Sequence, residues 1–377
     1  MSKSVLAVMI FLSLILLDGC KSEEKDSSTP PSTSTPTPLP LGFGNPKWSP
    51  DGKSIALTSN LSGHYGIWVM QADGSNLTQL AEDGLMPEWS PDGRLIAFAS
   101  FTSGNSDVWI VGSDGSNPIN LTVSNLGADR SPQWSPDGKH LAYIAEDPSR
   151  VNANIWVIEP DGSNPAKLTE DQNYIYDILC WSPNGESIAS TVTVIDPKVT
   201  DFEDITRDNQ VQVNGFEIIK LSNLETANFA AGKTITRLVW SPQGDTIAFS
   251  ALTSDIAAGN TYTDIWIVHL DNPDPINLTN NTAFAGFDGY PAWSLDSSYL
   301  AFVSFEEGKG NLYTLKMDDS TITNLTNAFG GINLIGSPDW SPDGQKIAFS
   351  LDNGNGPDIW VINADGSNPV NLTATYQ

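Results

Sequence analysis

The residues best suited to chemistry in this sequence lie shortly before a recurring Trp-Ser-Pro segment, and they carry mostly charged or phenolic side chains. They are Asp129, Arg130, Tyr176, Asp177, Arg237, Asp288 and Tyr290. The two arginines could bind a carboxylate or phosphate group of a ligand, or they could pair with neighbouring aspartates. Asp177 and Asp288 could instead act as the paired carboxylates of a glycosidase or lyase. We predict a binding face at these seven residues and keep the enzyme as the alternative.

Other chemical motifs are weak or absent in the sequence. No G-x-S-x-G segment marks a serine nucleophile, and His64, His140 and His269 are too scattered to indicate a triad or zinc site. We therefore assign no catalytic residue and no cofactor, and we predict a non-enzyme. The segment DNGNGPD, from Asp352 to Asp358, offers oxygen ligands and is a Ca²⁺ candidate, although it departs from EF-hand spacing.

Aromatic side chains support a second alternative, a carbohydrate-binding module. Such a module would need several rings exposed and coplanar on one face. The candidate rings are Tyr65, Tyr174, Tyr176, Tyr262 and Tyr290.

The charge balance argues against a nucleic-acid partner. The chain has 45 acidic and 18 basic residues, for a formal net charge of −27. Binding to phosphate backbones needs clustered Lys and Arg. The excess negative charge instead favours solubility, cations and basic partners. Hydrophobic residues make up 39% of the sequence, which is enough for a substantial core.

The first 44 residues differ from the rest of the chain. Residues 1–19 combine Lys3 with an apolar run from Val5 to Leu17, which is typical of a signal peptide. Gly19 followed by Cys20 resembles the lipobox of bacterial lipoproteins, and that resemblance implies lipidation of Cys20. The alternative is an ordinary signal peptide followed by a coincidental cysteine. Residues 20–44 are rich in Ser, Thr and Pro, and they predict a disordered tether.

Residues 45–377 contain an internal repeat. W-S-P-x-G or a close variant begins at Trp48, Trp89, Trp134, Trp181, Trp240, Trp293 and Trp340. Each unit contains four short apolar segments separated by Gly, Pro and Asp turns, a pattern that predicts a four-stranded antiparallel meander. Because both faces of each sheet are apolar, each sheet needs a neighbour on both sides. We therefore predict an all-β, seven-bladed β-propeller of four-stranded antiparallel blades.

The repeat also predicts where core and loops lie. The third segments contain Trp68, Trp109, Trp156, Trp266 and Trp360, and we expect Ile219 and Tyr313 to take that place in the other two units. The two short turns of each unit must lie on one face, and the variable loops on the other. The longest of these loops runs from Ile195 to Asn214. Because function on a rigid scaffold tends to lie on variable loops, we expect this loop face to be the functional one.

The segments WSPDG, IAF, DIWV, DG and LT together resemble the WD-like repeat of the TolB propeller family over Asn45 to Thr373. The resemblance implies docking of envelope proteins at the channel mouth. TolB itself differs in having six blades, an N-terminal α/β domain and no membrane tether. We expect a monomeric, lipid-anchored, extracytoplasmic scaffold that binds envelope proteins or cell-surface polymers. We expect the ring to close without an interlocked blade, with Leu39 to Asn45 available as an additional edge strand.

Overall fold

The structure is a computed structural model in which residues 42–376 are described, apart from several gaps. The gaps comprise residues 124–126, 148–151, 171–173, 196–210, 256–259, 280–286, 307–308, 330–332, 335, 353 and 355. The predicted signal segment and nearly all of the predicted tether therefore lie outside the described residues. Within the described ranges, no helix has the length and apolarity needed to cross a bilayer.

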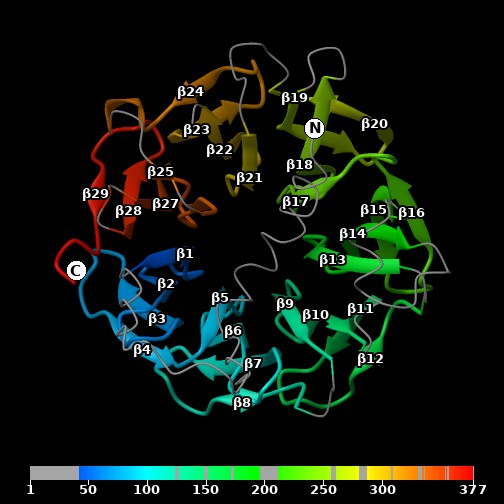
Figure 1. Cartoon of the computed structure of the whole chain (residues 1–377), viewed down its shortest axis with the longest axis horizontal. Helices are drawn as coiled ribbons and strands as arrows, with labels where there is room; N and C mark the ends of the chain where they lie inside the picture. The colour runs from blue at the N-terminus through cyan, green and yellow to red at the C-terminus, as the bar shows by residue number, and fades with distance from the viewer. Residues whose placement is uncertain are drawn as a thin grey trace, which may run out of the picture.

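The described chain is all-β apart from one 3₁₀ turn, η1 (Asn327–Phe329), and its sheets are arranged around a common axis (Figure 1). The first sheet contains β1 (Phe43–Trp48), β2 (Ser54–Ser59), β3 (Gly66–Gln71) and β4 (Thr78–Ala81). The second contains β5 (Gly84–Trp89), β6 (Leu95–Ser100), β7 (Asp107–Gly112) and β8 (Ile119–Asn120). The third contains β9 (Asp129–Trp134), β10 (Leu141–Glu146), β11 (Ala153–Ile158), β12 (Ala166–Lys167), β13 (Tyr174–Trp181), β14 (Ser187–Ile195), β15 (Val211–Lys220) and β16 (Thr226–Phe229).

The remaining strands form two further sheets. The fourth contains β17 (Ile235–Trp240), β18 (Thr246–Asp255), β19 (Asn260–His269), β20 (Asn272–Asn277), β21 (Phe287–Trp293), β22 (Tyr299–Glu306), β23 (Lys309–Lys316) and β24 (Ile322–Asn324). The fifth contains β25 (Asn333–Leu334), β26 (Asp339–Trp340), β27 (Lys346–Asp352), β28 (Pro357–Asn363) and β29 (Val370–Asn371). Figure 1 shows β1, β5, β9, β13, β17 and β21 nearest the axis. We call these six strands and β26 the inner strands.

The strands pair antiparallel in chain order within each repeat unit, as predicted, but the units do not all form separate sheets. Two parallel residue pairs, Ala153 with Ile175 and Thr263 with Phe287, join neighbouring units into eight-stranded sheets. Both pairs form where the inner strand of one unit begins beside the third strand of the preceding unit. The periodic pattern could not predict these contacts, because they depend on how closely adjacent units approach.

The core lies between neighbouring sheets, which explains why each second strand is apolar on both faces. Ile96, Ala97 and Phe98 are consecutive, and all are at most 1% exposed. Ala97 packs with Trp134 and Tyr143 of the following unit, whereas Ile96 and Phe98 pack with the preceding one. The short Ala side chain lets the adjacent sheet approach, and burial of large aromatic side chains dominates the packing.

The Ser-Pro-Asp-Gly turns hold themselves together. In the turn after β5, Ser90 Oγ donates to Asp92 Oδ1 (2.7 Å) and accepts from the Leu95 backbone N–H (2.9 Å). The variant WSLDS keeps this arrangement, with Ser294 Oγ donating to Asp296 Oδ1 at 2.6 Å. Ser297 has a φ of 60° there, the left-handed conformation that Gly supplies in the other turns.

The tryptophans that end the inner strands link neighbouring units by hydrogen bonds. Four indole Nε1 groups donate to a backbone carbonyl of the preceding inner strand: Trp89 to Lys47 (3.0 Å), Trp134 to Glu88 (3.2 Å), Trp181 to Gln133 (3.0 Å) and Trp340 to Ala292 (3.1 Å). Each acceptor is the residue directly before a repeat tryptophan. In the described part of the chain, the indole N–H groups of Trp48, Trp240 and Trp293 are buried without an acceptor.

The register of the third strands confirms one predicted substitution and corrects the other. Tyr313 lies opposite Phe302, the position that Trp266 occupies opposite Phe249. In the fourth unit, however, the residue at this position is Glu217 and not Ile219, because Glu217 pairs with Ser190. The aromatic pair of the other units is therefore replaced by a polar pair, in which the Glu217 residue is only 5% exposed.

The first and last sheets meet through side chains and not through a shared strand. Trp48 and Met70 pack against Ile359 and Leu372, and the Trp48 backbone N–H donates to Asp339 Oδ2 at 2.7 Å. Of the expected edge strand, Leu39 to Asn45, residues 39–41 lie outside the described residues. Residues 43–44 continue β1 past a bulge and pair with residues 58–59 of β2.

Candidate binding site on the inner strands

Each inner strand presents certain positions toward the axis. In β9, Pro132 and Trp134 are buried and Gln133 is half-buried. A bulge earlier in the strand then turns both the third and the fourth residue before Trp toward the same side, and the residues at these two positions are half-buried in all seven units. We call the half-buried first, third and fourth residues before each repeat tryptophan the axis-facing residues.

One cluster of charged and polar side chains joins four successive inner strands across the seam between the last and first units. Lys47 Nζ lies 3.1 Å from Glu88 Oε1 and 3.9 Å from Asp339 Oδ1. Gln133 Nε2 donates to Glu88 Oε1 at 3.1 Å. All four residues stand directly before a repeat tryptophan. These residues were not predicted as a site, because the predicted site residues all lie farther from Trp. The available signal was that the residue directly before Trp is basic in one unit and acidic in two others.

The two acidic partners of Lys47 shift the pKa values within this cluster. The Glu88 carboxylate holds the pKa of Lys47 above its usual range despite burial. Burial raises the pKa of Asp339 to about 6, while Lys47 and the Trp48 N–H oppose that rise and Glu88 adds to it. The cluster thus places two acidic side chains around one lysine.

Asp339→Asn should remove a pH dependence of stability. The folded protein binds the Asp339 proton more tightly than the unfolded chain, so this group's contribution to the free energy of unfolding falls as pH rises from about 4 to about 6. One quarter of the Asp339 side chain is exposed, and we expect the variant to be about 1–2 kcal/mol more stable than the native chain at pH 8. The difference should vanish near pH 4. Denaturant unfolding of both proteins at several pH values measures it, and a pH-independent difference would contradict the assignment.

A second charged cluster lies between the third and fourth units. Arg130 Nη1 donates to Asp177 Oδ1 at 2.5 Å, and Arg130 Nε donates to Glu146 Oε1 at 3.1 Å. The Arg130 side chain is 15% exposed and that of Asp177 is 39% exposed. The ion-pair alternative therefore holds for Arg130, because its guanidinium pairs with Glu146 and Asp177.

Arg237 has a different environment. Its guanidinium carbon lies 5.0 Å from the centroid of the Tyr290 ring on the next inner strand, and Nη1 donates to the Thr236 carbonyl at 3.3 Å. Tyr290 has a φ of 57°, so the strand bulge places it in the left-handed region. No ion pair joins Arg237 to a carboxylate among the described residues.

The predicted site residues divide into two groups. All seven lie within inner strands. Arg130, Asp177, Arg237 and Tyr290 are axis-facing. Asp129, Tyr176 and Asp288 are 0–1% exposed, and Tyr176 Oη donates to Glu217 Oε2 at 3.3 Å.

The aromatic and calcium candidates are also placed by the structure. Tyr65 is 44% exposed, whereas Tyr176 is buried in the core, so these two rings do not share one exposed platform. In the segment DNGNGPD, Asp352 Oδ1 accepts the backbone N–H groups of Gly354 (2.7 Å) and Gly356 (3.1 Å). Within the described ranges, no three His, Cys, Asp or Glu side chains are grouped so that they could hold a metal ion.

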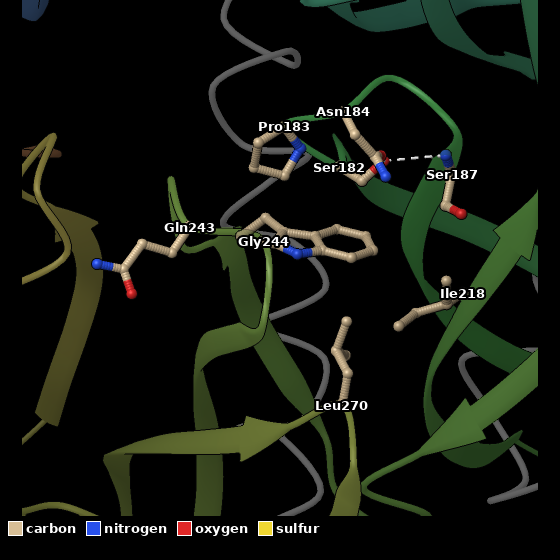
Figure 2. A pocket seen from close by; sticks show the side chains of 9 residues that line it. Ser182, Pro183, Asn184, Ser187, Ile218, Gln243, Gly244 and Leu270 are labelled. Carbon is tan, nitrogen blue, oxygen red and sulfur yellow. Dashed lines mark hydrogen bonds between the residues drawn. The ribbon is translucent and has the colours of Figure 1, made fainter.

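A pocket of about 460 Å³ opens on the turn face between the fourth and fifth units (Figure 2). The turn that begins at Ser182 and the turn containing Gln243 border it, and Ile218 and Leu270 line its depth. Trp240, one of the tryptophans without an indole acceptor, also lines it. None of the predicted site residues lies there.

Comparison with known proteins agrees with the fold. The chain is similar to the β-propeller domain of the Trilobed protease from Pyrococcus furiosus, described as having an open velcro topology, with 14% identity, 89% of this chain and 97% of that one covered, and a TM-score of 0.63. It is also similar to TolB from Acinetobacter baumannii, with 16% identity, 88% of this chain and 79% of that one covered, and a TM-score of 0.51. A third similar structure is oligogalacturonate lyase from Vibrio parahaemolyticus, with 13% identity, 87% of this chain and 91% of that one covered, and a TM-score of 0.59. At these identities the likeness shows the fold alone. No curated protein sequence matches the chain.

The sequence profile of the TolB beta propeller domain matches residues 39–218 and 289–377. These ranges contain most of the W-S-P units and the inner strands that carry both charged clusters. The repeat, the ring of sheets and this match together show that the chain belongs to the TolB β-propeller domain family.

Proposed function

We propose that this chain is a lipid-anchored, extracytoplasmic, seven-bladed propeller that binds other proteins or surface polymers without catalysing a reaction. In this proposal each W-S-P unit is one blade of four strands, and the two eight-stranded sheets each contain two blades. Cys20 carries the lipid, and residues 20–44 form the tether. The protein acts as a monomer in the cell envelope.

One contrast between the two faces carries the proposal. On the turn face, the polar side chains bond within their own turns, as Ser49 Oγ does with Asp51 Oδ1 (2.7 Å) and Ser75 Oγ with Asp73 Oδ1 (2.6 Å). The inner strands instead carry Arg237 and Tyr290 in the half nearer the loop face. Among the described residues, the polar groups of these two side chains form no hydrogen bonds within a turn of this kind. A surface with unused hydrogen-bonding capacity on a rigid scaffold suits recognition.

Site-specific photo-crosslinking in the intact envelope tests which face binds. A benzoyl-phenylalanine at Tyr65, 44% exposed on the loop face, should crosslink a reproducible partner. The matched control is the same group at Leu295, 64% exposed in a turn of the opposite face, which should not. Cys20→Ser should move the protein out of the membrane fraction and weaken the Tyr65 crosslink. Equal crosslinking from the two faces would argue against a loop-face partner.

A specific observation favours an enzyme as the second candidate. Glu88 and Asp339 share one lysine, and the Asp339 pKa of about 6 suits a general acid. This pair replaces the predicted pair, Asp177 and Asp288, because Asp288 is fully buried. Oligogalacturonate, the substrate named for the lyase neighbour, is a reasonable first probe. Product formation that Asp339→Asn abolishes would favour the enzyme over the scaffold.

A further inference from the structure

Arg237 differs from the other two cations near the axis. Lys47 and Arg130 each contact two carboxylates, at 2.5–3.9 Å. Arg237 contacts the Tyr290 ring and one backbone carbonyl, with no carboxylate partner within the described part of the chain. A half-buried guanidinium with no counter-ion among the described residues is unexpected in a chain whose formal net charge is −27.

The inner strand beside Arg237 leaves space next to the aromatic ring. Gly289 stands at the fourth position before Trp, where the third and fourth units carry Arg130 and Asp177. Apart from the two chain neighbours of each glycine, a Cβ atom added to Gly289 would meet no heavy atom within 4 Å, and the same is true of Gly44 at the equivalent position of the first unit. The axis therefore has unfilled room at the level of Tyr290.

The chemistry of this place matches a carboxylate. A guanidinium presents a planar fork of N–H donors that fits both oxygens of a carboxylate. One cation neutralises a monoanion, whereas phosphate sites usually gather several donors. The Glu88 carboxylate raises the pKa of Lys47 and Arg237 opposes that rise by electrostatic repulsion, so an anion beside Arg237 would relieve a repulsion between cations. The Tyr290 ring supplies an adjoining apolar surface.

We propose that Arg237 and Tyr290 form a carboxylate-binding site, with the open space at Gly289 admitting the ligand. The inference rests on the proposed binding function and names the chemical group that the partner presents. Two sources carry this group, a peptide carboxylate and an acidic sugar.

The test uses benzoate as the probe and its neutral analogue benzamide as the control. Saturation-transfer NMR on the full chain should show saturable benzoate binding and much weaker benzamide binding. Arg237→Gln should weaken benzoate binding about tenfold or more. Arg94→Gln makes the same change of charge at an exposed turn residue, and it should change the affinity less than twofold.

A second variant keeps the charge and fills the space. Gly289→Leu should abolish benzoate binding while Arg237 remains, because the added side chain occupies the proposed ligand position. Circular dichroism and thermal unfolding verify that each variant is folded. Equal benzoate binding to native protein and Arg237→Gln, or no saturable binding to native protein, would overturn the site.

Competition against benzoate identifies the source of the carboxylate. Glucuronate against glucose tests the acidic sugar, and a peptide with a free C-terminal carboxylate against its amide tests the peptide. Failure of this inference is distinguishable from failure of the proposed function. If Arg237→Gln loses benzoate binding but keeps the Tyr65 crosslink, carboxylate binding stands and does not mediate that partner. If benzoate does not bind native protein but the crosslink forms, only the carboxylate site is lost.

Discussion

Trp134→Ala is expected to lower the free energy of unfolding by about 3–5 kcal/mol. Trp134 is 8% exposed and packs with Leu141 and Tyr143 of its own unit and with Ala97 and Val108 of the preceding one. Alanine would leave a cavity between two units that stack on each other, and neither unit can fill it alone. Equilibrium denaturation followed by fluorescence and circular dichroism measures the loss.

A pair of phenylalanine variants separates packing from hydrogen bonding at this position. Trp134→Phe removes the 3.2 Å hydrogen bond to the Glu88 carbonyl, whereas Trp240→Phe removes an indole N–H that has no acceptor in the described part of the chain. Trp134→Phe should therefore cost about 0.5–1.5 kcal/mol more than Trp240→Phe. Equal losses would show that the indole hydrogen bonds do not contribute to holding the units together.

The repeat made the local structure predictable because it combines two short-range signals. Ser, Pro, Asp and Gly at fixed spacing specify a tight turn, and consecutive apolar residues such as Ile96 to Phe98 specify a strand that is buried on both faces. Six of the twelve tryptophans are buried in the core, as expected for the same reason, and the other six are half-buried and pack against it. Each of these features depends on residues close to one another in the sequence, so it can be recognised within a single repeat unit.

The site was less predictable because it depends on contacts between units. Lys47 and Glu88 come from consecutive units, and Asp339 of the last unit reaches Lys47 only because the ring closes. The bulges in the inner strands change which residues face the axis, so Asp129 and Asp288 became buried while their neighbours did not. Glu217 was missed because its register with β14 follows a long insertion that shifts the spacing of the fourth unit.

Asp358→Ala should cost about 2–4 kcal/mol and should loosen the last outer strand. Asp358 is 1% exposed, and its two oxygens accept from Thr373 Oγ1 at 2.7 Å and from Asn371 Nδ2 at 2.8 Å. Alanine would leave both donors without this acceptor. It would also release β29, which pairs with β28 through only two residue pairs.

Asparagine is the matched control, because another unit already uses it. Asn311 stands at the same position of β23 and accepts from Thr326 Oγ1 at 3.2 Å. Asp358→Asn should therefore cost less than about 1 kcal/mol. Hydrogen exchange at the Leu372 amide, which donates to the Ile359 carbonyl at 2.8 Å, gives the local readout. Leu372 also packs against the first unit. Faster exchange in Asp358→Ala alone would therefore show that the hydrogen bonds of Asp358 to Thr373 and Asn371 support ring closure. Unchanged exchange in that variant would mean that side-chain packing closes the ring without it.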